Sequence, residues 1–269
     1  PPLSALPGGF VVSKRGQGQV VADSRMYIHG DDMRHLDRGA TARTGELHVR
    51  TFHEERDRVT FLVADFRPSM LWGMRRAFRS VAAAEALAWI GWQAVEEGGR
   101  VGLLAITGDT RVIVRTQGKL RGMLSVIGGL VKAHDAALAL AKRVARQAAH
   151  AKPFDDPRLD TALSGAHRIV PRGATMVLAS AMDSLGIGFG DVTGRLAQNR
   201  RLQVLRIEDR ALNNLPVGHY PIHSNDGTRR DVQFSRINEV ESIQLDYDVW
   251  RVDAGMPTRD AMIHAVVGR

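Results

Sequence analysis

Two carboxylates and two hydroxyls stand where the chain could hold a metal ion. Asp65 and Ser69 follow one apolar run, RVTFLVAD, and Asp183 follows a second, ATMVLASA. Thr161 lies at the start of a predicted helix that leads into the second run. Oxygen ligands of this kind suit an octahedral Mg²⁺ whose shell is completed by water. The sequence therefore predicts a magnesium site formed by Asp65, Ser69, Thr161 and Asp183.

Arg67 interrupts this pattern. It stands between Asp65 and Ser69, in DFRPSM, where a metal loop of the form Asp-x-Ser-x-Ser has its middle serine. Arginine carries only donors, so it cannot bind a metal ion. A cation about 4 Å from the metal costs about 4 kcal/mol per unit of metal charge at an effective dielectric of about 20, and twice that beside Mg²⁺.

Several fates of Arg67 stay open. It could turn to solvent beside a bound Mg²⁺. Its guanidinium could instead fill the site, with no metal, and pair with Asp65 and Asp183. It could also point outward and contact a partner protein. A plainer alternative is that Asp65 only caps the following helix.

The elements that would position these residues alternate between strand and helix. Residues 58–65 form a predicted strand that is apolar on both faces, as central parallel strands are. Further strands are predicted at 100–107, 174–181 and 201–209, with an antiparallel edge strand at 111–117. Helices are predicted at 78–98, 119–133, 134–151, 158–170 and near 191–199. This alternation predicts a three-layer, Rossmann-like α/β fold whose ligands lie at the carboxyl ends of the strands.

Residues 25–70, RMYIHGDDMRHLDRGATARTGELHVRTFHEERDRVTFLVADFRPSM, resemble the signature of the domain-of-unknown-function 58 family. The match falls on the residues Tyr27, Gly30, Asp31, Asp32, Arg34, Asp37, Thr41, Ala42, Arg43, Glu55 and Arg56. Two positions depart from the family pattern: Arg38 replaces a tryptophan, and Arg67 replaces the serine of the metal loop. The resemblance extends more loosely to about residue 210.

The resemblance implies a von Willebrand factor A-like domain with a metal-ion-dependent adhesion site. It carries over Asp65, Ser69, Thr161 and Asp183 as metal-site positions. It also implies that the protein acts beside a MoxR-type AAA+ ATPase, as an adaptor in the assembly or maturation of a client protein. On this view the strand-end loops present a metal, or Arg67, to an acidic side chain of the partner.

Three regions are predicted along the chain. Residues 1–56 form an arm that wraps onto the next domain, residues 57–210 form the von Willebrand factor A-like domain, and residues 211–269 form a hairpin and helix extension. In the arm we expect an ion network that ties it to the sheet. Its members are Asp31, Asp32, Arg34, Asp37, Arg43, Glu55 and Arg56.

Composition excludes several other functions. The chain of 269 residues has no cysteine, which excludes a disulfide framework and thiolate chemistry and favours a cytoplasmic location. It has no P-loop motif and no Gly-x-Ser-x-Gly elbow. The net charge is +8, but the basic residues are spread along the chain, so nucleic-acid binding is not expected. No apolar run is expected to span a bilayer, and the first ten residues are not expected to act as a signal peptide.

Two functions follow from these observations. The first is a non-enzymatic adaptor that binds an AAA+ ATPase and a client, with Mg²⁺ or, if Arg67 fills the site, with no cofactor. The second is a Mg²⁺-dependent hydrolase or phosphoryl-binding enzyme that uses Asp65 and Asp183. The strand-end loops offer no clear general base or nucleophile, which favours the adaptor.

Overall fold

The computed structural model describes residues 21–52, 58–147, 156–212, 215–223, 229–234 and 247–267. These fall into two compact units, one within residues 10–57 and one that begins at Arg58. Each unit is described by itself.

The first unit is a two-stranded antiparallel sheet with short helices. Its elements are β1 (Val21–Met26), the 3-10 helix η2 (Met33–His35), α1 (Arg38–Thr44) and β2 (His48–Phe52). Asp37 begins α1 by accepting hydrogen bonds from the backbone N–H groups of Gly39 and Ala40, and Gly45 ends it in the left-handed conformation. Ala40 and Val49 are its buried apolar side chains among the described residues.

The second unit is built on a six-stranded sheet in the order β10-β7-β6-β3-β4-β5. Its strands are β3 (Val59–Asp65), β4 (Arg100–Ile106), β5 (Arg111–Gly118), β6 (Thr175–Ser180), β7 (Arg201–Glu208) and β10 (Asp248–Asp253). All neighbours pair in parallel except β5, which runs antiparallel to β4 at one edge. The predicted mostly parallel α/β fold with an antiparallel edge strand is confirmed.

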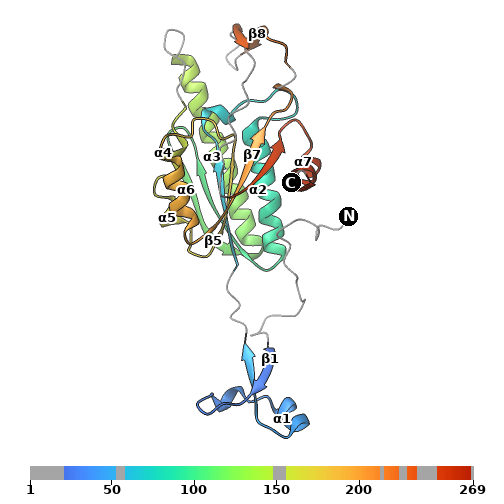
Figure 1. Cartoon of the computed structure of the whole chain (residues 1–269). Helices are drawn as coiled ribbons and strands as arrows, with labels where there is room; N and C mark the ends of the chain where they lie inside the picture. The colour runs from blue at the N-terminus through green and yellow to red at the C-terminus, as the bar shows by residue number, and fades with distance from the viewer. Residues whose placement is uncertain are drawn as a thin grey trace. The chain divides into compact units, whose positions relative to one another are not determined.

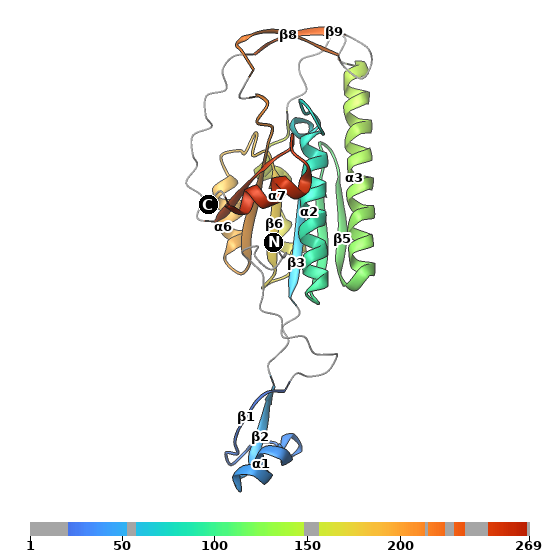
Figure 2. The same ribbon diagram turned by 90° about the vertical axis from the view of Figure 1, so that its right-hand side faces the viewer.

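Helices cover both faces of this sheet, as Figures 1 and 2 show. The helices are α2 (Arg79–Glu96), α3 (Lys119–Gln147), α4 (Leu159–Leu163), α5 (Ala166–Ile169), α6 (Phe189–Ala197) and α7 (Thr258–Val267). On β3, Leu62 and Ala64 pack in the core under α2, α3 and α7, whereas Phe61 and Val63 pack in the core under α4, α5 and α6. This alternation is why the strand is apolar on both faces.

The structure differs from the predicted elements in the helices. Residues 119–147 form the single helix α3, because no helix breaker lies between Ala133 and His134. Residues 158–170 form two short helices, because Gly165 adopts the left-handed conformation with φ +80°.

The structure also differs in the last region. Strand β10 pairs with β7 as the far edge of the central sheet, so this part of the expected extension belongs to the domain itself. The expected hairpin is β8 (Gly218–His223) with β9 (Arg229–Phe234).

Helix α3 is long and apolar enough, between Lys119 and Arg146, to cross a membrane. This corrects the expectation that no segment of that kind would occur. The finding is weak evidence, because core helices of globular domains pass the same test, and α3 contacts β4, β5 and α2.

Candidate functional site: an arginine in the place of a metal

Arg67 lies buried at the carboxyl end of β3. Its side chain and that of Asp65 both have 0% exposure. The backbone N–H of Arg67 donates to Asp65 Oδ1 at 3.0 Å, so the chain turns immediately after the strand. The 3-10 helix η3 (Pro68–Met70) follows, with Pro68 at its first position. This turn brings the guanidinium back onto the carboxylate two residues earlier.

The guanidinium pairs with both oxygens of Asp65. Arg67 Nε donates to Oδ1 at 3.0 Å and Arg67 Nη2 donates to Oδ2 at 2.8 Å, which is the bidentate arrangement that favours arginine. The hydroxyl of Ser180, at the end of β6, donates to the same Oδ2 at 2.7 Å. Both carboxylate oxygens of Asp65 are therefore engaged within the protein.

The other side of the guanidinium joins two further segments. Arg67 Nη1 donates to the carbonyl of Pro157, and Arg67 Nη2 donates to the carbonyl of Asp183 at 2.9 Å. The carboxylate of Asp156 lies 3.2 Å from Nη1. Burial works against the charged form of Arg67, but the neighbouring carboxylates outweigh it and hold its pKa above the ordinary value. One buried cation thus connects the segments that follow β3, precede α4 and follow β6.

Asp156 is a member of this site that sequence reasoning missed. It accepts hydrogen bonds from the backbone N–H of Ser69 at 3.2 Å and from the Ser69 hydroxyl at 2.8 Å. Burial raises the pKa of Asp156, and the cation of Arg67 opposes that rise. The segment KPFDDP was interpreted only as a break between helices, and its two acids next to a proline were the available signal.

Asp183 contacts Arg67 through its backbone carbonyl. Its carboxylate turns instead to Arg79, whose Nη1 donates to Oδ2 at 3.1 Å. The Arg79 guanidinium lies 4.8 Å from the ring centroid of Trp72. Burial raises the pKa of Asp183, and Arg79 opposes this. The predicted contact between Arg67 and Asp183 exists, but it is made to the carbonyl group.

The loop that carries Asp183 has an uncommon backbone. Met182 and Ser184 adopt left-handed conformations with φ of +63° and +48°. Asp160 supports the loop, because its backbone N–H donates to the Leu185 carbonyl at 2.9 Å and its carboxylate accepts from Gly188 N–H at 3.0 Å.

Thr161 is not brought to this site. It is exposed, and its hydroxyl donates to Asp160 Oδ1 at 3.0 Å. Its carbonyl accepts from Arg111 Nη2 at 3.1 Å. The helix start predicted for Thr161 is present, but its hydroxyl serves the local turn.

The residues present do not fit a magnesium ion. Arg67 takes the position between Asp65 and the neighbouring loops, and the hydroxyl of Ser69 is committed to Asp156. In the described part of the chain, no three His, Cys, Asp or Glu side chains gather as metal ligands. The metal site stays a prediction, and in this structure the guanidinium of Arg67 lies against Asp65, where that prediction places the ion. The alternative in which the guanidinium of Arg67 fills the site agrees with these contacts.

The burial of Arg67 also corrects its expected role at a partner surface. A side chain with 0% exposure cannot contact another protein unless the loops around it open. Neither of the outward-pointing alternatives for Arg67 matches the structure.

Comparison with known protein families shows which family the chain belongs to. A family model described as "Protein of unknown function DUF58" matches residues 23–242. The chain belongs to this family. The match covers most of the chain, so the resemblance inferred from residues 25–70 is confirmed.

Other proteins resemble this DUF58 chain over parts of their length. The uncharacterised proteins Rv1480 of Mycobacterium tuberculosis and Mb1516 of Mycobacterium bovis are 37% identical over 103 residues, which are 38% of this chain and 32% of theirs. The aligned part is thus about a third of the length of these relatives.

Solved structures support the fold of the DUF58 chain. The conserved hypothetical protein BatB from Bacteroides thetaiotaomicron superposes with a TM-score of 0.52 at 14% identity, over 77% of this chain and 95% of that one. The SpRpn10 VWA domain gives a TM-score of 0.40 at 13% identity, over 56% and 76%. The likeness to BatB supports the three-layer α/β fold described above, with its mostly parallel sheet and helices on both faces.

The acids of the DUF58 signature form local pairs in the first unit. Asp31 accepts a bidentate pair from Arg25 at 2.8 and 2.7 Å, and Asp32 accepts from Arg34 Nε at 3.1 Å. Hydrogen bonds from their partners lower the pKa of both acids. Asp37 caps α1 as described above. The predicted members Glu55 and Arg56 lie outside the described residues, and a link between this unit and the sheet stays a prediction.

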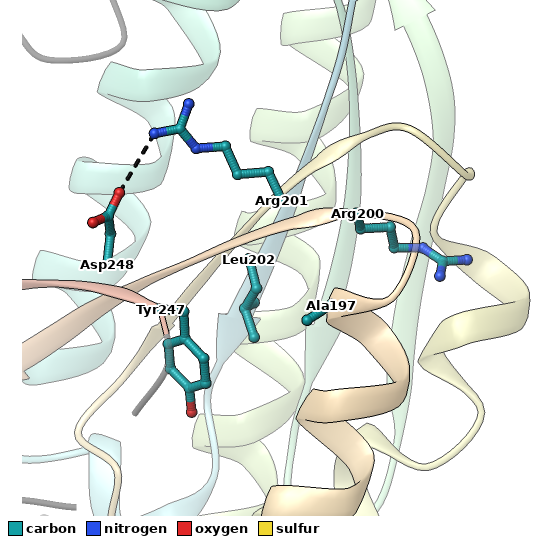
Figure 3. Close-up of a pocket in the computed structure, with 6 residues that line it drawn as sticks. All are labelled: Ala197, Arg200, Arg201, Leu202, Tyr247 and Asp248. Atoms are coloured by element: carbon teal, nitrogen blue, oxygen red, sulfur yellow. Dashed lines mark hydrogen bonds and ion pairs between the residues drawn. The ribbon is translucent and has the colours of Figure 1, made fainter. Parts of the chain in front are cut away.

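A separate pocket of the DUF58 domain lies at the opposite end of the strands (Figure 3). Its volume is about 480 Å³, and it is lined by Ala197, Arg200, Arg201, Leu202, Tyr247 and Asp248. Arg201 pairs with Asp248 at 3.4 Å, and burial raises the pKa of Tyr247 to about 12. None of the predicted site residues lines it.

Proposed function

We propose that this DUF58 protein is a non-enzymatic adaptor that acts with a MoxR-type AAA+ ATPase on a client protein in the cytoplasm. The von Willebrand factor A-like fold supports a role in protein interaction. The observation that carries the proposal is the buried Arg67, which holds the strand-end loops together as a metal ion would. The adaptor surface is thereby formed without a cofactor.

The chemistry of the site supports binding over catalysis. A hydrolytic role needs a carboxylate that is free to activate water or hold a metal ion. Both oxygens of Asp65 are engaged by Arg67 and Ser180, and the carboxylate of Asp183 is paired with Arg79. These pairings favour protein binding over hydrolysis.

The loops held by Arg67 offer a surface for the ATPase. Ile187, in the loop after β6, is 95% exposed, and Met74, in the loop before α2, is 40% exposed. Exposed apolar side chains on loops of fixed shape are typical of a binding surface. The exposed Arg158 precedes Leu159, whose backbone N–H donates to the Ser184 carbonyl in the loop of Ile187, so its positive charge lies near that loop and suits an acidic region of the ATPase.

Binding between the purified chain and a MoxR-type ATPase from the same organism tests the proposal. We expect saturable binding by biolayer interferometry and a loss of about tenfold in affinity for Ile187→Asp, because a charge would enter the apolar contact. Ile113→Asp, on the edge strand β5, is the matched control with an aliphatic side chain that is 51% exposed, and it should leave this affinity unchanged. Absence of binding in the ATP, ADP and nucleotide-free states would overturn the proposal.

A further inference from the structure

Helix α3 has an apolar face that nothing in the described structure covers. Its inner face is buried through Met123, Val126, Leu130, Ala133 and Ala137. On the outer face Leu120, Leu124 and Val131 are 57%, 55% and 56% exposed. They are spaced by four and seven residues, so they form one stripe along the helix. At about 1.5 Å per residue the stripe is about 16 Å long, or three turns.

Gly128 continues this stripe between Leu124 and Val131. A Cβ added there would meet nothing within 4 Å. The neighbouring Gly129 points the other way, where a Cβ would come within 2.7 Å of Val114 and 2.9 Å of Leu103. A small residue in the middle of an exposed apolar stripe lets the backbone of a second helix approach closely.

The charges beside the stripe are positive, except at its carboxyl end. From Arg111 to His134 the sequence has five basic residues and no acid. Lys119, Arg121 and Lys132 are exposed on α3, and none of the three has an ion-pair partner in the described part of the chain. Arg121 and Lys132 lie on one side of the stripe, and Asp135 is the acid at its carboxyl end. A ligand that covers the stripe therefore meets two to three cations.

We infer that the outer face of α3 binds an acidic amphipathic helix of a partner protein. The apolar side of that helix would cover Leu120, Leu124 and Val131, and its acids would pair with Arg121 and Lys132. Figure 2 shows α3 at the rim of its helix layer, beside α2 and β5, with its outer side clear of the other labelled helices. This surface is distinct from the strand-end loops, so the inference stands apart from the proposed adaptor surface.

Charge and shape favour this occupant over two others. A second copy of the chain would bring two sets of lysine and arginine together on the same face. Binding to a bilayer surface increases with the apolar area that enters it, and this stripe offers three aliphatic side chains with no Trp or Phe, which is a small area.

Two designed helical peptides test the inference. Both carry leucines at the spacing of the stripe; one has a flanking row of glutamates and the other has lysines in the same places. We expect fluorescence anisotropy to give an affinity at least about tenfold higher for the acidic peptide, and added salt to narrow the difference. Equal affinities, or no saturable binding of the acidic peptide, would overturn the inference.

Variants of the full chain test whether the peptide binds at the outer face of α3. Leu124→Asp and Lys132→Glu should each lower the affinity for the acidic peptide by about tenfold. Lys132→Glu should also raise the affinity for the basic peptide. Ile187→Asp, in the loop after β6, is the matched control and should have no effect. Circular dichroism checks that each variant is folded. If the parent associates with anionic vesicles and Leu124→Asp abolishes this, the face binds lipid instead. If the parent is a dimer in light scattering and Leu124→Asp makes it a monomer, the face binds a second copy of the chain instead.

Discussion

At the scale of single residues, one arginine changes the chemistry of the strand-end site. The guanidinium of Arg67 binds both oxygens of Asp65 and supplies one positive charge where Mg²⁺ would supply two, but unlike the ion it is covalently part of the chain. The cation therefore cannot be lost by dilution or chelation. We therefore expect the site to keep the same form with and without divalent ions.

Replacing Arg67 by serine should expose the metal site that the sequence pattern suggests. Removal of the guanidinium leaves Asp65 buried without its cation, and we expect a loss of about 3–5 kcal/mol in the free energy of unfolding. Added Mg²⁺ should recover part of that loss, because the introduced serine would offer the missing hydroxyl. Calorimetric titration with Mg²⁺ measures the binding, and chemical denaturation with and without Mg²⁺ measures the stability.

The parent protein and Arg67→Lys are the controls for this experiment. The parent should show no Mg²⁺ binding heat and the same unfolding midpoint with EDTA as with Mg²⁺. Arg67→Lys keeps the charge but loses the bidentate geometry, so it should be destabilised and should not gain metal binding. Binding of Mg²⁺ by the parent, abolished by Asp65→Ala, would contradict our interpretation of the site.

Asp156 should give the site a defined dependence on pH. Burial raises its pKa above the ordinary 3.8, so the folded protein holds this proton more tightly than the unfolded chain does. Its contribution to the free energy of unfolding is therefore favourable at low pH and falls as pH rises from about 3.8 through the raised pKa.

The variant Asp156→Asn isolates this effect. Asparagine cannot titrate, so the stability of the parent relative to the variant should decrease as the pH rises above about 4. Urea denaturation at several pH values measures the difference. A difference that increases over this range would mean that the pairing with Arg67 outweighs the burial of Asp156.

At the scale of elements, periodicity predicted most of the framework, and the errors have physical causes. The apolar strands from 58–65 to 201–209 were found because parallel strands are buried on both faces. Asp65 and Ser69 were placed correctly at a strand end for the same reason. The direction of the Arg67 side chain could not be predicted, because it depends on carbonyls of Pro157 and Asp183 that are distant in the sequence.

Two adjacent glycines of α3 should respond oppositely to alanine. Gly128 faces open space, so Gly128→Ala should raise the free energy of unfolding by up to about 1 kcal/mol through helix propensity. Gly129 faces Val114 and Leu103, so Gly129→Ala should lower it by about 1–3 kcal/mol through overpacking. Urea denaturation of both variants tests the orientation of α3, and effects of the same sign would show that the helix is rotated relative to our description.

At the scale of the whole molecule, the main sheet is completed from the last region of the chain. The sequence pattern predicts a domain boundary at residue 210, because no strong strand pattern follows it. The strand β10 is short, and only Trp250 and Val252 of its residues turn into the core. A six-residue strand with two buried side chains gives little periodic signal, so its place beside β7 became visible only in the structure.

Trp250 tests whether residues beyond 210 are an extension or part of the core. Its side chain is 6% exposed and packs in the core shared with α2 and α7, so Trp250→Ala should lower the free energy of unfolding of the full chain by about 3–5 kcal/mol. Val249, the preceding residue of β10, is 37% exposed, and Val249→Ala is the matched control with an expected loss of about 1 kcal/mol or less. Thermal and urea unfolding measure both variants. If the two losses were equally small, β10 would contribute little to the fold, and the domain would end near residue 210 as the sequence alone suggests.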